Sequence, residues 1–425
     1  AGAAALAGRL PVPVAVTDNP RRDLAPVAAW IYGDPSSRLT LLGVTGTNGK
    51  TTTSYLLEAG LRAAGHTTGL LGTVQTRMAG AVVPSVRTTP EASDLQALLA
   101  TMVERGVTAA AMEVSSHALA QHRADALRFA GAAFTNLTQD HLDYHPTMED
   151  YFEAKARLFT PGRAAAAVVC VDDEWGRRLA ERVPDAVTCS LAGPAHWRAA
   201  DVTSGPAGST FLALGPGGER VEVSLALPGR FNVANALTAL ALLVAAGVPA
   251  RTAAEGMASL AGVPGRMERV DVGQPFLALV DYAHTPDAVT TLLTTVRSLV
   301  KGKVIVVLGC GGDRDRGKRP LMGAAAARLA DLAVFTNDNP RSEDPQAILD
   351  QMLAGAREVP GERAAVTVLP DRAAAIAAAV AAAGPGDAVV VAGKGHETGQ
   401  EQGGVVTPFD DREVLRSALL TAVDR

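Results

Sequence analysis

The chain has 425 residues, of which 48% are apolar and 20% charged, enough material for two or three hydrophobic cores. Its net charge of −5 shows no basic footprint and argues against nucleic acid and acidic membranes as partners, and its apolar runs are too short to span a bilayer. The three cysteines lie far apart without a C-x-x-C pair, and no charged-then-apolar signal opens the chain, so we predict a multidomain cytoplasmic protein.

The first 37 residues predict too little structure for a domain. Residues 12–16 suggest a strand and residues 25–32 a short helix that ends at a Gly-Asp-Pro turn. Because Ala1 is not a methionine, we expect the numbering to begin inside a longer natural protein.

A phosphate-binding loop is predicted by residues 39–53, LTLLGVTGTNGKTTT, which read as strand, glycine turn and helix start. Gly46 and Gly49 let backbone amides curl inward, Lys50 adds a positive charge, and the Thr51 hydroxyl suits a magnesium ion. The usual first glycine is replaced by Val44, so a glycine-rich turn with a chance lysine is the alternative. Strand, turn, Lys-Thr pair and helix all coincide, which favours a nucleoside triphosphate site.

A second ligand-bearing region follows. Residues 107–112 are small or apolar and end at Glu113, typical of a buried strand that delivers a carboxylate to the sheet edge where ligands bind. The polar runs at 115–117 and 121–123 also fit an ordinary helix cap and a solvated turn. Residues 130–134 predict another strand, and the loop after it is crowded with side chains that can bind metal.

Lys155 falls on the apolar stripe of a helix predicted over residues 148–159. Periodicity alone favours a snorkelling lysine, whose stem lies on apolar surface while its ammonium reaches water. The alternative is that burial lowers the amine pKa and leaves a neutral, reactive amine.

Residues 161–225 predict strands, loops and glycine-rich hairpins without clear chemistry. Asn232 and Asn235 begin an alanine-rich helix to about residue 246, and an N-cap explains only one of them. The turn residues 262–266 are the best domain boundary in the chain.

The last part again alternates strands and helices, which predicts a second doubly wound sheet. Its strands are expected at residues 276–280, 304–308, 332–336, 365–369 and 388–392. The run Gly309-Cys310-Gly311-Gly312 is only a partial dinucleotide motif, because its third glycine would be Arg314. Charged runs at four strand ends, 281–284, 313–316, 338–341 and 393–397, instead predict a polar, zwitterionic ligand.

Together these motifs resemble the Mur ligases, the ATP-dependent amino-acid-adding enzymes of bacterial cell-wall precursor synthesis. The matches are TGTNGKT at 45–51, EVSSH at 113–117, DHLD at 140–143, the Lys155 helix, the two asparagines, GRME at 265–268 and DYAH at 281–284. The resemblance covers residues 39–425 and accounts for the replaced first glycine. It implies an α/β fold with a central P-loop ATPase domain over 38–262, a Rossmann-like domain over 263–425, and a remnant of an N-terminal UDP-binding domain over 1–37.

Within the family, the run DNPR at 338–341 resembles the signature of members that add meso-diaminopimelate to UDP-N-acetylmuramoyl-L-alanyl-D-glutamate. Lysine-adding relatives differ there, particularly at the arginine. An arginine fork suits the extra carboxylate of diaminopimelate. The same letters at 18–21 are interpreted as coincidence.

The resemblance also implies site residues. ATP is expected at Thr45, Gly46, Thr47, Asn48, Gly49, Lys50, Thr51, Asn232, Asn235, Arg266, Asp281 and His284. The muramoyl dipeptide is expected at Thr88, Thr89, Ser115, Gln121 and Arg123. Diaminopimelate is expected at Arg314, Asp338, Asn339, Pro340, Arg341, Gly393 and Glu397. Lys50, Glu113, His141 and Lys155 are the expected catalytic residues, with Thr51 and Glu113 on one Mg²⁺ and His141 and a carbamylated Lys155 near a second.

The implied reaction is amide ligation through an acyl phosphate, by a monomeric enzyme without nucleic-acid or membrane partners. Taken singly, His141 also fits a hydrogen-bonded loop histidine and Glu113 a helix-cap carboxylate. The alternatives for the whole chain are a lysine-adding ligase, a folylpolyglutamate-synthetase-like ligase, and a nucleotide-dependent switch that ligates nothing.

Overall fold

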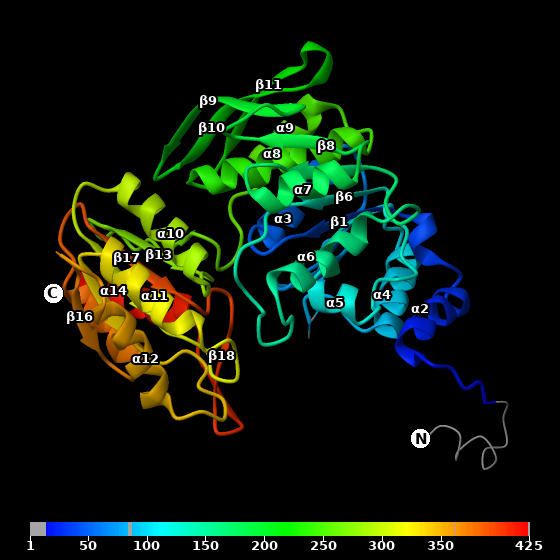
Figure 1. Ribbon diagram of the computed structural model, residues 1–425. Coiled ribbons are helices and arrows are strands. Elements are labelled where there is room, and N and C mark those ends of the chain that lie inside the picture. The colour runs from blue at the N-terminus through cyan, green and yellow to red at the C-terminus, as the bar shows by residue number, and fades with distance from the viewer. Residues whose placement is uncertain (1–13, 84–86, 362, 424–425) are drawn as a thin grey trace.

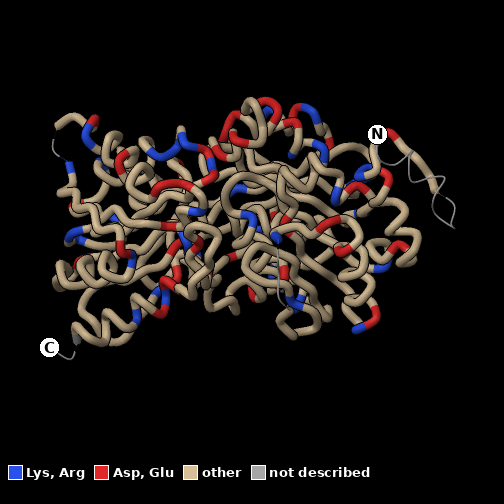
Figure 2. The backbone as a smooth tube through the Cα atoms, turned by 90° about the horizontal axis from the view of Figure 1, so that it is seen from below, with Lys and Arg blue, Asp and Glu red and all other residues tan. Residues whose placement is uncertain are grey.

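A computed structural model describes residues 14–83, 87–361 and 363–423 (Figure 1). The chain forms an eleven-stranded sheet, then a six-stranded sheet and a small hairpin. In Figure 1 the second sheet and its helices, yellow-green to red, lie beside the first, blue to green. Basic and acidic residues are interspersed over both parts in Figure 2.

The large sheet has the order β11-β10-β9-β8-β7-β6-β1-β5-β2-β3-β4. Its strands are β1 (Thr40–Thr45), β2 (Thr68–Leu71), β3 (Thr76–Met78), β4 (Ala81–Val83), β5 (Ala109–Glu113), β6 (Gly131–Phe134), β7 (Ala167–Cys170), β8 (Val187–Ser190), β9 (Trp197–Gly205), β10 (Gly208–Leu214) and β11 (Arg220–Leu225). Strand β1 pairs in parallel with β5 and β6, so the carboxyl ends of the three strands meet at one edge.

Helices cover both faces of this sheet, because its parallel strands are apolar on both sides. Leu42 and Val44 pack into one core and Leu41 into the other. The helical segments of this half are α2 (Pro20–Ile31), η1 (Pro35–Arg38), α3 (Lys50–Ala63), α4 (Ala92–Glu104), α5 (Ser116–Ala120), α6 (Met148–Ala156), η2 (Arg157–Phe159), α7 (Glu174–Arg182), η3 (Pro216–Gly218), α8 (Arg230–Ala245) and α9 (Ala250–Ala258).

The second sheet has the order β12-β13-β17-β14-β15-β16 and is parallel except at β12. Its strands are β12 (Glu268–Arg269), β13 (Leu277–Asp281), β14 (Val304–Leu308), β15 (Leu332–Phe335), β16 (Ala365–Val368) and β17 (Ala388–Ala392), and the hairpin is β18 (Gly399–Gln402) with β19 (Val405–Pro408). Its helices are α10 (Pro286–Leu299), α11 (Lys318–Leu329), α12 (Pro345–Arg357), α13 (Arg372–Ala381) and α14 (Asp411–Val423). The predicted doubly wound sheet is confirmed, with strand ends shifted by at most one residue.

The structure corrects some predicted elements. Residues 14–16 are not in a strand, and the rest of the strand predicted over 12–16 lies outside the described residues. The helix predicted over 25–32 begins earlier, at Pro20, because the Asn19 side chain caps it and proline suits a first helical turn. The region 161–225 also contains α7. In the ranges that the structure describes, no helix is both long and apolar enough to cross a bilayer.

Candidate active site

The loop between β1 and α3 requires its two glycines. Gly46 has φ 148°, and a Cβ there would lie 1.9 Å from Thr135 Oγ1. Gly49 has φ 88°, and a Cβ would lie 2.2 Å from Asn235 Oδ1. The Asn48 carbonyl accepts a hydrogen bond from Thr135 Oγ1 at 2.6 Å, which braces the turn against β6. The turn therefore has a fixed, close-packed shape at the carboxyl end of β1, as a phosphate loop requires.

Two lysines converge on this loop. Lys50 Nζ donates to the carbonyls of Gly46 and Thr47, at 3.0 and 2.7 Å, and Lys155 Nζ donates to the same Gly46 carbonyl at 2.6 Å. Only 1% of Lys155 is exposed, and its amine lies 4.5 Å from the centre of the Tyr151 ring. The snorkelling interpretation is therefore wrong. Burial, together with the nearby Lys50 charge, lowers the pKa of Lys155 well below its usual value.

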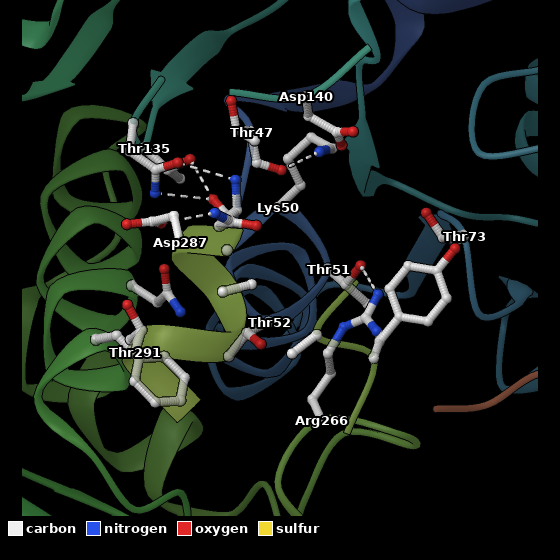
Figure 3. A pocket seen from close by; sticks show the side chains of 18 of the residues that line it. Thr47, Lys50, Thr51, Thr52, Thr73, Thr135, Asp140, Arg266, Asp287 and Thr291 are labelled. Atoms are coloured by element: carbon white, nitrogen blue, oxygen red, sulfur yellow. Dashed lines mark hydrogen bonds between the residues drawn. The ribbon is translucent and has the colours of Figure 1, made fainter. Parts of the chain in front are cut away.

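The carboxylate of Glu113 lies at the end of β5, opposite the start of α3. It is 1% exposed and accepts hydrogen bonds from Thr51 Oγ1 at 3.1 Å, from Thr73 Oγ1 at 3.0 Å and from the Thr73 backbone at 2.8 Å. Arg266, which comes from the second half of the chain, donates to Thr51 Oγ1 at 3.1 Å (Figure 3). Thr73 was not predicted, because it belongs to no motif and its one signal is its position just after β2.

Asp140 joins the two halves of the chain. Its carboxylate lies 3.6 Å from Lys318 Nζ, 3.8 Å from His284 Nε2 and 3.4 Å from His141 Nε2. Burial alone would raise the pKa of Asp140, but these three groups hold it below its usual value. Burial lowers the pKa of His141 to about 3, so this imidazole is neutral at pH 7. The sequence placed Asp140 in a motif but did not predict its partner Lys318.

A cavity of about 320 Å³ lies where the two halves meet. The first half contributes residues of the phosphate loop together with Glu113, His141 and Lys155, and the second contributes Arg266, Asp281, Tyr282 and His284. Other lining residues are less polar: Phe231, Ala234, Ala288 and Leu292. A hydrogen bond from Asn48 Nδ2 to Asp287 Oδ2, at 3.1 Å, crosses between the halves (Figure 3).

Two of the residues predicted for ATP make supporting contacts with other residues of the chain. Asn232 does not line the cavity; its Oδ1 accepts from Asn235 Nδ2 at 3.2 Å, and Asn235 does line it. Asn235 thus faces the cavity, and Asn232 holds its side chain in place through this hydrogen bond. The Asp281 carboxylate accepts from the backbone amides of Met267 and Ala283, at 2.7 and 2.8 Å, so it shapes the turn that carries Arg266.

The residues predicted for the muramoyl dipeptide gather around the start of α5. Thr89 Oγ1 donates to the Glu113 carbonyl at 2.9 Å, and Arg123 Nη1 donates to the Thr89 carbonyl at 3.1 Å. Arg123 Nη2 donates to Gln121 Oε1 at 2.5 Å. Thr88 and Ser115 line the cavity.

The N-terminal DNPR run lies beside this group. Asn19 is the N-cap of α2 and Pro20 its first residue, while Arg21 pairs with Glu91 at 3.2 Å and donates to Gln121 at 3.4 Å. The run therefore forms a helix start with one contact to a residue predicted for the substrate, and its likeness to the run at 338–341 stays interpreted as coincidence.

The residues predicted for diaminopimelate lie at the carboxyl edge of the second sheet. Asn339 Nδ2 donates to Glu397 Oε2 at 2.8 Å. Arg341 has φ 53°; its Nη1 donates to the Gly312 carbonyl at 2.7 Å and its Nε lies 3.5 Å from Glu401 Oε2. Of the remaining members, Arg314 bonds its neighbour's carbonyl, and a Cβ on Gly393 would lie 2.6 Å from Asp338 Oδ2. Parallel strands bring these loops together, as predicted.

The residues at this site could bind Mg²⁺ only if phosphate oxygens and water supplied the remaining ligands. Among the described residues, no three His, Cys, Asp or Glu side chains gather into a metal cage. The Thr51 hydroxyl and Glu113 carboxylate are nevertheless adjacent hard oxygen ligands, and Mg²⁺ typically takes one or two such groups and completes its shell with phosphate oxygens and water.

Comparison with known proteins identifies the fold. Residues 44–243 match the Mur ligase middle domain, and residues 265–395 match the Mur ligase glutamate ligase domain. The chain belongs to the Mur ligase family. It is 58% identical over 412 residues to the UDP-N-acetylmuramoyl-L-alanyl-D-glutamate–2,6-diaminopimelate ligase of Streptomyces coelicolor, covering 96% of this chain and 81% of that protein. The protein of the same name from Corynebacterium glutamicum is 52% identical over 415 residues, covering 96% and 80%.

Solved structures agree. A UDP-N-acetylmuramoyl-L-alanyl-D-glutamate–2,6-diaminopimelate ligase superposes with a TM-score of 0.66 at 36% identity, covering 96% of this chain and 84% of that one. The ADP complex of Mycobacterium tuberculosis folylpolyglutamate synthase superposes with a TM-score of 0.72 at 21% identity, covering 88% and 92%, and shows the shared fold alone. The family also explains why a phosphate loop and a second α/β sheet face one cavity.

Proposed function

We propose that this Mur ligase is the ATP-dependent enzyme that adds meso-diaminopimelate to UDP-N-acetylmuramoyl-L-alanyl-D-glutamate in peptidoglycan precursor synthesis. The observation that carries the proposal is the cavity in which the phosphate loop of one sheet meets residues from the other. The names of relatives at 52–58% identity supply the substrates.

The reaction has two steps. The free carboxylate of the D-glutamyl residue attacks the γ-phosphorus of ATP, an O–P bond forms, and the bond to the β-phosphate oxygen breaks to release ADP. The amine of diaminopimelate then attacks the acyl carbon, an N–C bond forms, the C–O bond to phosphate breaks, and the amine loses a proton. Phosphoryl transfer depends mainly on positioning and charge stabilisation, so the loop amides and Lys50 carry the protein's share.

Magnesium, when bound, would neutralise charge on the transferring phosphoryl group. Thr51 and Glu113 are the proposed ligands of one ion, because their oxygens already lie 3.1 Å apart in a buried setting. His141 and Lys155 are proposed near a second ion. Both line the cavity, and the imidazole is in its neutral, ligating form at pH 7.

Lys155 is proposed to carry a carbamate. Only a neutral amine reacts with carbon dioxide, forming an N–C bond and releasing a proton, and the lowered pKa of Lys155 favours that form. The product places an anion in the cavity where the neutral amine stood. Carbon-13 NMR of protein equilibrated with labelled bicarbonate should show a carbamate signal that disappears in Lys155→Met.

We propose the three predicted binding groups, for ATP, the muramoyl dipeptide and the amino acid, each supported by the contacts described above. The phosphate loop with Asn232, Asn235, Arg266, Asp281 and His284 is proposed to hold ATP. The group around Thr89 and Arg123 is proposed to hold the muramoyl dipeptide, and the edge of the second sheet the amino acid. We propose that closure of the second half onto the first accompanies turnover, with the contacts of Asp140 to His284 and Lys318 holding the halves together in the closed state.

The proposal also covers the domain boundaries, the oligomeric state and the cellular location. We keep the boundaries at 38 and 263, because the two sheets lie on either side of the turn at 262–266. Residues 1–37 are proposed to end a UDP-binding domain, since the chain spans about four fifths of its relatives. A monomer in the cytoplasm is expected, where ATP is available and the three cysteines stay reduced.

The test is ADP release by the full-length protein with UDP-N-acetylmuramoyl-L-alanyl-D-glutamate and magnesium, with meso-diaminopimelate or L-lysine added in parallel. Release with diaminopimelate alone is expected. Release with lysine alone would keep the ligase and overturn the substrate assignment. Nucleotide binding without amino-acid-dependent release would favour the switch.

A further inference from the structure

A buried lysine contacts two residues of the proposed amino-acid site. Lys394 follows β17 and is 0% exposed. Its Nζ lies 3.0 Å from Asn339 Oδ1 and 3.0 Å from Glu397 Oε2. A buried ammonium is tolerated only with such partners, so the position is specific and not an accident of packing.

The lysine fixes both side chains at once. Asn339 Oδ1 accepts from Lys394 and from the Glu401 amide at 2.9 Å, so its Nδ2 must point toward Glu397. Glu397 Oε2 receives two donors, whereas its Oε1 makes no hydrogen bond to any residue that the structure describes. One carboxylate oxygen is thereby held and the other is left for a ligand ammonium.

The backbone of these loops is held by a different group. Arg372 donates to the carbonyls of Ala392 and Asn337, at 3.0 and 3.3 Å, and pairs with Asp411. Those carbonyls come just before the loops that carry Lys394 and Asn339. The loop path therefore does not depend on Lys394, whose contacts are to side chains.

Lys394 also balances the charge at its own contacts. In the group of Lys394, Asn339 and Glu397, the lysine carries the positive charge and Glu397 the negative one. Without Lys394 the Glu397 carboxylate is an uncompensated negative charge, which suits a cationic side chain. With Lys394 the group is neutral and suits a side chain that ends in both an ammonium and a carboxylate.

We propose that Lys394 is a positioning residue that holds Asn339 and Glu397 and balances the charge of the site, so that a zwitterionic amino-acid end is preferred over a cationic one. The inference rests on the proposed function and deepens it. Lys394 acts through its two neighbours, so its removal should affect amino-acid recognition and spare ATP.

The experiment compares Lys394→Met, Lys394→Gln and wild type by steady-state ADP release from the full-length protein, with diaminopimelate or L-lysine as acceptor. Lys394→Met should raise the KM for diaminopimelate about tenfold or more, because two charge-assisted hydrogen bonds are lost. The KM for ATP should stay within about twofold, and the preference for diaminopimelate over lysine should fall about tenfold or more. Lys394→Gln keeps a donor without the charge, so it should recover part of the KM but not the preference.

Lys301→Met is the matched control, since this lysine is exposed before β14 at the opposite edge of the same sheet, and it should match wild type. In the background of Glu397→Gln, Lys394→Met should add little. Unchanged KM and preference in Lys394→Met would overturn the inference, as would an equal rise in the KM for ATP or loss of the folded state. If wild type uses lysine alone, the proposed substrate and the charge argument both fail, while a raised KM for lysine in Lys394→Met would still support the positioning role.

Discussion

The ion pair between Arg372 and Asp411 provides a quantitative test of how the amino-acid loops are supported. Both side chains are 0% exposed, and two parallel hydrogen bonds of 2.7 Å join them. Arg372→Met would leave Asp411 as a buried carboxylate without its counterion, which typically costs about 3–5 kcal/mol. That is a large part of the roughly 5–15 kcal/mol that stabilises a domain.

For a unit of this size each kcal/mol shifts the Tm by roughly 2–4 °C, so the expected drop is roughly 6–20 °C. Differential scanning calorimetry measures it. The double variant with Asp411→Leu should recover more than half of the loss, because no charge is then left buried. The KM for diaminopimelate should rise in the single variant, since the carbonyls of Asn337 and Ala392 lose their donor. A Tm within about 1 °C of wild type in Arg372→Met would refute the reasoning.

Three further predictions concern separate parts of the molecule. Arg341→Ala should raise the KM for diaminopimelate about 10- to 100-fold and far more than that for ATP, whereas equal effects in steady-state kinetics would refute its assigned role. Gly46→Ala places a Cβ 1.9 Å from Thr135 Oγ1. The ATP affinity measured by calorimetry should fall about 100-fold or more while the circular dichroism spectrum stays native. Unchanged affinity would contradict the phosphate-loop assignment. Burial lowers the pKa of His396 to about 3, so below about pH 6.5 the unfolded chain binds a proton at this residue and the folded chain does not. Urea unfolding should therefore show about 1–2 kcal/mol less stability at pH 5 than at pH 7 from this group, and His396→Gln should lack that difference.

Much of the fold was predictable because its signals are local. A buried parallel strand needs a continuous apolar run, and β14 and β17 were predicted to the residue for that reason. The phosphate loop was also predictable, since its glycines, lysine and threonine are neighbours in sequence. The order of eleven strands and the pairing of β7 with β8 and of β8 with β9 were not, because long-range pairing leaves little trace in a short window.

The candidate site was predictable where side chains follow strand ends and unpredictable where they act across the fold. Thr73 sits in a short turn after β2 and gives no motif, yet it donates twice to Glu113. Periodicity placed Lys155 on an apolar stripe but favoured snorkelling, which is wrong. An apolar stripe does not show whether the ammonium at the end of the lysine side chain can reach water.

Local sequence was enough to specify the reactive groups: a phosphate loop, a carboxylate at the end of β5, a helix with a lysine on its apolar face, and four charged strand ends. These follow from backbone conformation and hydrophobic period, which neighbouring residues specify. Which of these groups come into contact depends on the tertiary fold. It brought Lys318 and His284 to Asp140, Arg266 to Thr51, and Lys394 between Asn339 and Glu397. Such contacts depend on how two sheets pack together, a property of the whole chain that no local pattern encodes.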